Sequence, residues 1–140
     1  MTKTNQNKLV VKSTTDNLAK IRDFIRTSAQ KSGFPDDSIG KLILAVDEAC
    51  TNIIKHAYKY NSDGVIDIST KSDKSKFTIQ ITDSGINFDP KAVPDPDIKE
   101  YHKQHKSGGL GMFLMKKLMD EVQYRNLKEN RNQVIMVKYF

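Results

Sequence analysis

Two kinds of hydrophobic spacing alternate along the chain. From Asp16 to about Lys31, apolar residues recur every three or four positions, and the same spacing returns from Pro35 to about Tyr60. This spacing predicts two amphipathic helices. Asp16 is the expected cap of the first helix, and Gly33 is its expected stop.

Other segments alternate with the two-residue period of a half-buried strand. A short strand is expected at residues 8–13, and residues 65–72 and 76–83 are expected to form a hairpin. A closing hairpin is expected from VQYRNL and QVIMVKYF around a turn at residues 128–132. Residues 110–120 again carry an apolar stripe at helical spacing, which predicts a third helix.

The order of these elements is strand, helix, helix, two strands, loop, helix and two strands. It predicts an α+β fold, a two-layer sandwich with helices on one face of a mixed, mostly antiparallel sheet. The 140 residues fit a single domain, 1–140. The irregular region from Ser84 to Gly108 is rich in Asp, Pro, Lys and His, and a loop of that length is typical of a functional or mobile segment.

Composition excludes some classes of protein. No apolar run is long enough to span a bilayer, and the N-terminal residues lack the apolar stretch of a signal peptide. The single cysteine, Cys50, cannot form an internal disulfide. These features predict a cytoplasmic protein without membrane contact.

The net charge of +6 invites a nucleic-acid hypothesis. However, the lysines and arginines are scattered from Lys3 to Lys138, and no basic helix is interleaved with aromatic residues. A solvated basic surface, or one that attracts an acidic protein or a nucleotide, explains the charge equally well. We therefore do not expect direct nucleic-acid binding.

The second predicted helix carries Glu48, Asn52 and His56 at four-residue spacing. This spacing places them along the face opposite the apolar one. An ordinary solvated face would explain them, but Leu44 and Ala45 lie on the same far side, which indicates that this face borders something. The expected core side consists of Ile39, Ile43, Val46, Cys50, Ile53 and Ala57.

Two glycine segments carry further candidate chemistry. Asp83 and Gly85 stand where an alternating strand ends, although Asp-Ser-Gly is also a common turn. Gly108, Gly109 and Gly111 open a helix directly, which suits an anion but also a hinge. The segment matches neither a Walker A loop nor a dinucleotide fingerprint. Together with the helix face, the two segments suggest a Mg–nucleotide pocket.

Three stretches resemble a known family. LAVDEACTNIIKHAY is similar to the N box of the gyrase, Hsp90, histidine-kinase and MutL (GHKL) type of ATPase domain, and TDSGINFDP and SGGLGMFLMKKLMDEV are similar to its two glycine boxes. Their order, spacing and length most resemble the anti-sigma factor serine-protein kinases of the RsbW and SpoIIAB type. The resemblance covers nearly the whole chain and implies the Bergerat, histidine-kinase-like ATPase fold.

The resemblance also implies roles for single residues. Glu48 would be the catalytic carboxylate, Asn52 the Mg²⁺ ligand and Asp83 the acceptor of the adenine amino group. Residues 90–107 would be a mobile ATP lid, and His56 would be structural. The implied ATP-binding residues are Glu48, Asn52, Asp83, Gly85, Lys106, Ser107, Gly108, Gly109, Leu110 and Gly111.

One position departs from the family pattern. Asn87 stands where the wider superfamily has the second glycine of the first glycine box. Asparagine tolerates left-handed backbone geometry better than most residues, so ATP binding is still expected. The effect of Asn87 on ATP turnover stays open.

By this resemblance, the protein would sequester a sigma factor and phosphorylate a serine of a STAS-domain anti-anti-sigma antagonist, using ATP and Mg²⁺. The family branch commonly forms homodimers. The alternatives are a nucleotide-binding partner-switching module with little or no kinase activity, and a detached ATPase domain of a two-component system. No helical phosphoacceptor region precedes the motifs, which disfavours the last. The sequence does not identify the sigma factor or the antagonist.

Overall fold

Five strands form one sheet in the order β1-β2-β3-β5-β4. The computed structural model describes residues 5–85 and 115–140. Every neighbouring pair in these residues is antiparallel, so the expected parallel component of the sheet is absent there. The strands are β1 (Asn5–Lys12), β2 (Val65–Ser72), β3 (Lys76–Asp83), β4 (Glu121–Leu127) and β5 (Arg131–Tyr139).

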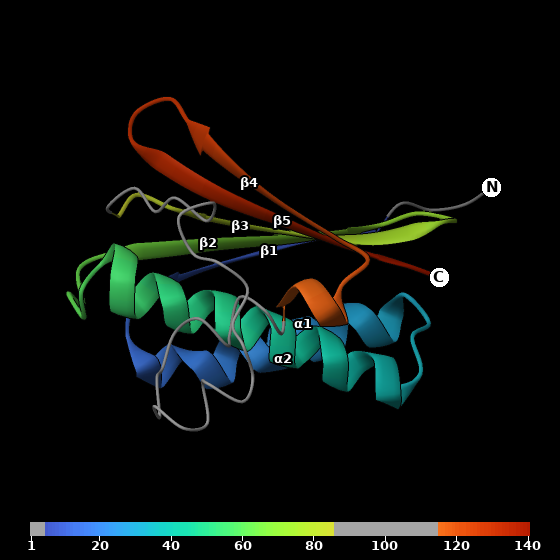
Figure 1. The fold of residues 1–140 in the computed structure, drawn as a ribbon. Helices are drawn as coiled ribbons and strands as arrows, with labels where there is room; N and C mark the ends of the chain where they lie inside the picture. Colours follow the sequence, from blue (N-terminus) through green and yellow to red (C-terminus); the bar gives the residue numbers. More distant parts are fainter. Residues whose placement is uncertain (1–4, 86–114) are drawn as a thin grey trace, which may run out of the picture.

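The two long helices, α1 (Leu18–Lys31) and α2 (Asp36–Asn52), lie side by side on one face of the sheet (Figure 1). The predicted two-layer α+β fold is therefore confirmed. Beyond Asn52 the chain continues as a π-helical turn, η2 (Ile53–Ala57). Such turns often mark functional sites in helices.

The start of the first helix differs from the prediction. A short 3-10 turn, η1 (Thr15–Asn17), precedes α1, so Asp16 lies inside that turn. The prediction that Asp16 caps the helix is wrong, because the cap positions are Thr14 and Asn17, and neither side chain caps a backbone N–H. Gly33 does stop α1, since its φ of 92° favours glycine.

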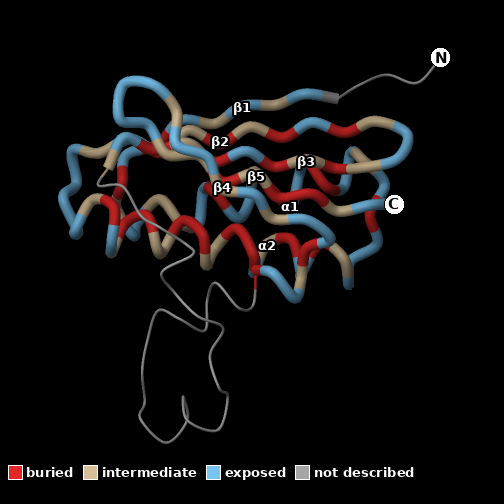
Figure 2. The backbone as a smooth tube through the Cα atoms, turned by 45° about the horizontal axis from the view of Figure 1, so that its top comes forward, coloured by how far each residue is buried: buried red, intermediate tan, exposed pale blue. Residues whose placement is uncertain are grey.

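The core lies between the helices and the sheet, where the buried segments of Figure 2 face each other. Ile43 is only partly buried, although it was expected in the core. Ala45 is buried, although it was placed on the far side of the helix, and Ala49 is buried as well. The buried face of α2 is therefore wider than its apolar stripe. The largest fully buried side chains include Ile21, Ile25, Leu42, Ile54, Ile66, Ile68, Phe77, Ile79, Ile81, Met115 and Met136.

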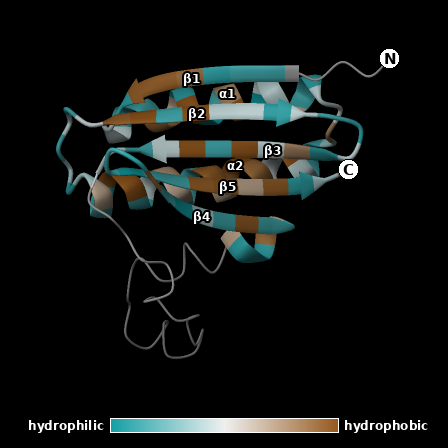
Figure 3. Cartoon of the chain, turned by 90° about the horizontal axis from the view of Figure 1, so that it is seen from above, coloured by the Kyte–Doolittle hydropathy of each residue, from teal (hydrophilic) through white to brown (hydrophobic). Residues whose placement is uncertain are grey.

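The other face of the sheet carries no helix of the described residues and is seen from above in Figure 3. The turn between β4 and β5 uses positive φ angles at Glu129 and Asn130, as in tight hairpin turns. The predicted helix at 110–120 is described only from residue 115, and its helical turn ends at residue 118. No helix in the described ranges combines the length and apolar character that crossing a membrane requires.

Candidate functional site

A row of polar side chains crosses one end of the sheet. The buried alternation Phe77, Ile79, Ile81 along β3 continues to Asp83, which therefore turns its carboxylate towards the helices. Asn132 of β5 stands directly opposite Asp83. Antiparallel register thus brings an amide from near the C-terminus beside the predicted adenine-binding carboxylate.

The carboxylate of Asp83 is held through one of its oxygens. Its Oδ1 atom accepts hydrogen bonds from the Gly85 N–H at 2.9 Å and from Asn132 Nδ2 at 3.0 Å. Burial raises the pKa of Asp83, while the hydrogen bonds from Asn132 and Gly85 act in the opposite direction. Asp83 is only 6% exposed, so a charge here needs polar partners.

Gly85 packs directly against the end of the helix. A Cβ atom at this position would lie 2.5 Å from the Ala57 carbonyl oxygen, which no side chain tolerates without movement. The hydroxyl of Tyr58 donates to the Val65 carbonyl and accepts the Ser84 N–H, each at 2.7 Å. Gly85 is therefore required by close packing, and the HAY end of the first motif fixes the segment after β3.

Helix α2 supplies the other polar wall. Asn52 is its last residue, is half-buried and lines the pocket with Asp83. Glu48 lies one turn earlier, is half-buried and is not among the pocket-lining residues. Burial raises the pKa of Glu48, and the negative charge of Asp47 adds to this, whereas Lys55 opposes it. Asp47 is itself paired with Arg22 of α1 at 2.8 Å.

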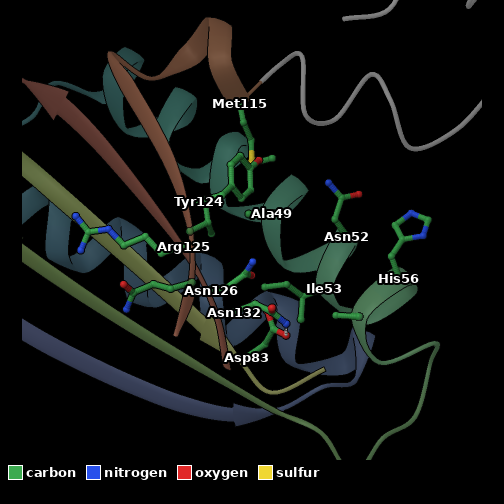
Figure 4. Close-up of a pocket in the computed structure, with 13 residues that line it drawn as sticks. Ala49, Asn52, Ile53, His56, Asp83, Met115, Tyr124, Arg125, Asn126 and Asn132 are labelled. Atoms are coloured by element: carbon green, nitrogen blue, oxygen red, sulfur yellow. Dashed lines mark hydrogen bonds between the residues drawn. The ribbon is translucent and has the colours of Figure 1, made fainter. Parts of the chain in front are cut away.

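The pocket lies between the end of α2 with η2 and the ends of β3, β4 and β5 (Figure 4). Its lining surface is mostly apolar, with a few polar side chains that include the buried Asp83, which is the usual composition of a small-molecule site. Within residues 5–85 and 115–140, no group of three His, Cys, Asp or Glu side chains could hold a metal ion alone. The lining residues are Ala49, Asn52, Ile53, His56, Ala57, Asp83, Met115, Tyr124, Arg125, Asn126, Asn132, Gln133 and Val134.

Comparison with known proteins explains this arrangement. Residues 11–138 match the model of the histidine kinase-like ATPase domain. The chain belongs to this family. Its relatives include the serine-protein kinase RsbW of Listeria monocytogenes serovar 1/2a, 34% identical over 79% of this chain and 72% of the relative. RsbW of Bacillus subtilis strain 168 is 35% identical over 79% and 71% of the two chains. The resemblance to the RsbW type is therefore confirmed.

Solved structures share the fold of this family member. The RsbU and RsbW domains of a Mycobacterium tuberculosis protein align with a TM-score of 0.68 and 13% identity, over 96% of this chain and 32% of that one. A chain of the SiaB–SiaC complex of Pseudomonas aeruginosa aligns with a TM-score of 0.61 and 10% identity, over 94% and 89% of the two chains. At these identities the likeness shows the fold alone, which is the predicted histidine-kinase-like ATPase fold.

Several residues predicted to serve the ATPase site lie outside the described residues. They are the lid at 90–107, Asn87 and the phosphate-side residues Lys106, Ser107, Gly108, Gly109, Leu110 and Gly111. Asn52 and Asp83 line one pocket, and the Gly85 N–H donates to Asp83 at the end of β3. His56 is exposed at the pocket rim.

Sequence reasoning missed two residues of this ATPase-family pocket. Asn132 donates a hydrogen bond to Asp83, the carboxylate predicted to bind adenine. Tyr124 lines the pocket and carries a buried hydroxyl. Neither belongs to a recognised motif. Tyr124 lies in the predicted strand VQYRNL, whereas Asn132 was placed in the turn at 128–132, which is wrong because Asn132 belongs to β5. Strand alternation in the closing hairpin does not reveal the register with β3.

Proposed function

We propose that the chain is an ATP-dependent serine-protein kinase and anti-sigma factor. It would transfer the γ-phosphoryl group of ATP to a serine of a STAS-domain anti-sigma-factor antagonist, and it would bind a sigma factor. The observation that carries this proposal is the pocket shared by Asp83 and Asn52, with Glu48 one turn before Asn52 on α2. RsbW serine-protein kinases with about one third sequence identity support it.

The described residues fit a purine nucleotide. Asp83 is a buried acceptor suited to an exocyclic amine, and Gly85 keeps the backbone after β3 close to the helix. The apolar walls suit the faces of a base, and a buried hydroxyl in the wall, that of Tyr124, has no protein partner in the described ranges. The pocket therefore offers an acceptor, apolar walls and an additional donor.

The donor set also fits Mg²⁺ that is shared with phosphates. Asn52 supplies an amide oxygen, and Mg²⁺ prefers oxygen ligands while keeping waters and substrate phosphates in its shell. When bound, the ion would offset phosphate charge during phosphoryl transfer. Asn52 would hold the ion, and Glu48 would orient or deprotonate the serine hydroxyl of the protein substrate.

The direct test mixes the purified protein with Mg–ATP and candidate STAS-domain antagonists and detects phosphoserine by mass spectrometry. Transfer is expected with a cognate antagonist and should be abolished by Glu48→Ala, while ATP stays bound. Asn52→Ala should weaken Mg–ATP binding as well. Asp47→Asn is the matched control, because it removes the neighbouring carboxylate from the same helix and should keep transfer.

The alternative is a partner-switching module that binds nucleotide with little or no kinase activity. Glu48 is not among the residues that line the pocket, which supports this alternative. Measured ATP binding without phosphoserine on any antagonist would select it. Sigma-factor binding and homodimer formation are separate parts of the proposal, to be tested by co-purification and by light scattering.

A further inference from the structure

Tyr124 lines the pocket with a polar side chain. The hydroxyl oxygen of Tyr124 is buried and makes no hydrogen bond within residues 5–85 and 115–140. Burial raises the pKa of Tyr124 to about 12, so the hydroxyl keeps its proton at neutral pH and is available as a donor. A buried hydroxyl without a partner is unfavourable, and a site that tolerates one in the free protein is suited to a ligand that supplies the acceptor.

The sheet fixes where Tyr124 stands relative to Asp83. Tyr124 of β4 lies opposite Val134 of β5. Asp83 of β3 lies opposite Asn132, which is two residues before Val134 on β5. All four therefore share the face that the helices cover. Strands are spaced about 4.8 Å apart, so β5 separates β3 from β4 by about 10 Å. The two side chains therefore stand on either side of β5 and line one pocket.

The wall between these two polar groups is apolar. Ala49 of α2, Ile53 of η2, Met115 and Val134 are all buried. They line the same pocket, and the first three are labelled in Figure 4. A charged triphosphate would lose its hydration in such surroundings without compensation. The faces of a nucleobase would instead pack against these side chains.

We propose that the hydroxyl of Tyr124 donates a hydrogen bond to the nucleoside part of the bound nucleotide, at the edge away from the one that Asp83 binds. The inference rests on the proposed ATP site and adds a second polar anchor to it. In this arrangement Asp83 accepts from the exocyclic amine, and Tyr124 donates to an acceptor across the pocket. The hydroxyl makes no hydrogen bond to the described residues of the free protein, so it should contribute to the free energy of nucleotide binding and not to that of folding.

The test compares the wild-type protein with Tyr124→Phe. Affinities for Mg–ATP and Mg–ADP are measured by calorimetry, and thermal unfolding is measured without nucleotide. Loss of one neutral hydrogen bond should weaken both nucleotides by about the same factor, roughly three- to tenfold. The unfolding temperature without nucleotide should stay equal or rise, because the hydroxyl has no partner to lose.

Tyr60→Phe is the matched control, because Tyr60 is 63% exposed and lies outside the pocket lining. It should change neither affinity. Equal ATP affinity in the wild type and Tyr124→Phe would overturn the inference, as would a loss confined to ATP, which would place the contact on the terminal phosphate. A lower unfolding temperature of Tyr124→Phe without nucleotide would also overturn it. Absence of ATP binding by the wild type would instead refute the proposed function itself.

Discussion

The Nδ2 atom of Asn132 lies 3.0 Å from the Oδ1 atom of Asp83, although 49 positions separate the two residues. The same amide donates to the Gly85 carbonyl oxygen at 3.1 Å. Asn132 therefore joins β5 to the end of β3 and to the glycine segment that follows. The geometry of the proposed adenine subsite depends on this amide.

Replacing Asn132 with alanine should weaken ATP binding about three- to tenfold, because Asp83 and Gly85 lose the donor that orients them. Calorimetry with Mg–ATP measures the change. Gln80→Ala is the control, since Gln80 is exposed on the opposite face of β3 and should leave affinity unchanged. Unchanged affinity of Asn132→Ala would show that Asp83 does not need this partner.

Asp83→Asn should weaken ATP binding by about 10- to 100-fold, because an amide nitrogen replaces a charged acceptor opposite the adenine amine. Inosine triphosphate carries a carbonyl at that position, so its affinity should fall less. Titrations with the two nucleotides give the ratio. An equal loss for both would argue against a contact between Asp83 and the base amine.

The same variant tests the pH dependence of stability. Burial raises the pKa of Asp83 above its ordinary value of 3.8, so the folded protein binds a proton that the unfolded chain releases. Stability should therefore fall as pH rises from 3.8 to the raised pKa and stay constant above it. Asp83→Asn should remove this fall, as measured by urea unfolding of the nucleotide-free protein across the acidic range.

Gly85→Ala should destabilise the protein by about 1–3 kcal/mol, because the added methyl group meets the Ala57 backbone. Gly40→Ala is the matched control. A Cβ atom at Gly40 would meet open space, and the residue lies within α2, so alanine there should stabilise by about 0.5–1 kcal/mol. Urea unfolding of both variants measures the two changes in the free energy of unfolding, which should have opposite signs. Similar stabilities would show that the close approach at Gly85 is not restrictive.

The rate of phosphoryl transfer should fall at acidic pH, and the pH at which it falls should depend on the charges beside Glu48. Burial and Asp47 raise the pKa of Glu48, so a basic role for Glu48 is lost as pH falls through that raised pKa. Asp47→Asn should move this fall to lower pH. Arg22→Met should move it to higher pH, because it leaves the Asp47 charge unpaired. Profiles of transfer rate against pH decide this, and shifts of the same sign in both variants would contradict it.

Local patterns predicted most of the elements, because each depends on spacing within a single segment. The two-residue period of β3 predicted a strand that ends at Asp83 and so placed the carboxylate at a strand terminus. The closing hairpin was also predicted around the turn that contains Glu129 and Asn130. The expected cap at Asp16 was wrong because a 3-10 turn precedes α1, and residue preference alone does not distinguish these starts.

The sequence by itself determined the motifs, the amphipathic helices and the two-layer architecture, since these follow from side-chain chemistry at fixed local spacing. Tertiary structure decided which strands are neighbours, and therefore that Asn132 and Tyr124 share a pocket with Asp83. It also decided that Ala49 is buried, although the apolar stripe of α2 did not include it. Strand register and helix packing bring together residues that are far apart in the chain, and no local sequence pattern shows which of them become neighbours.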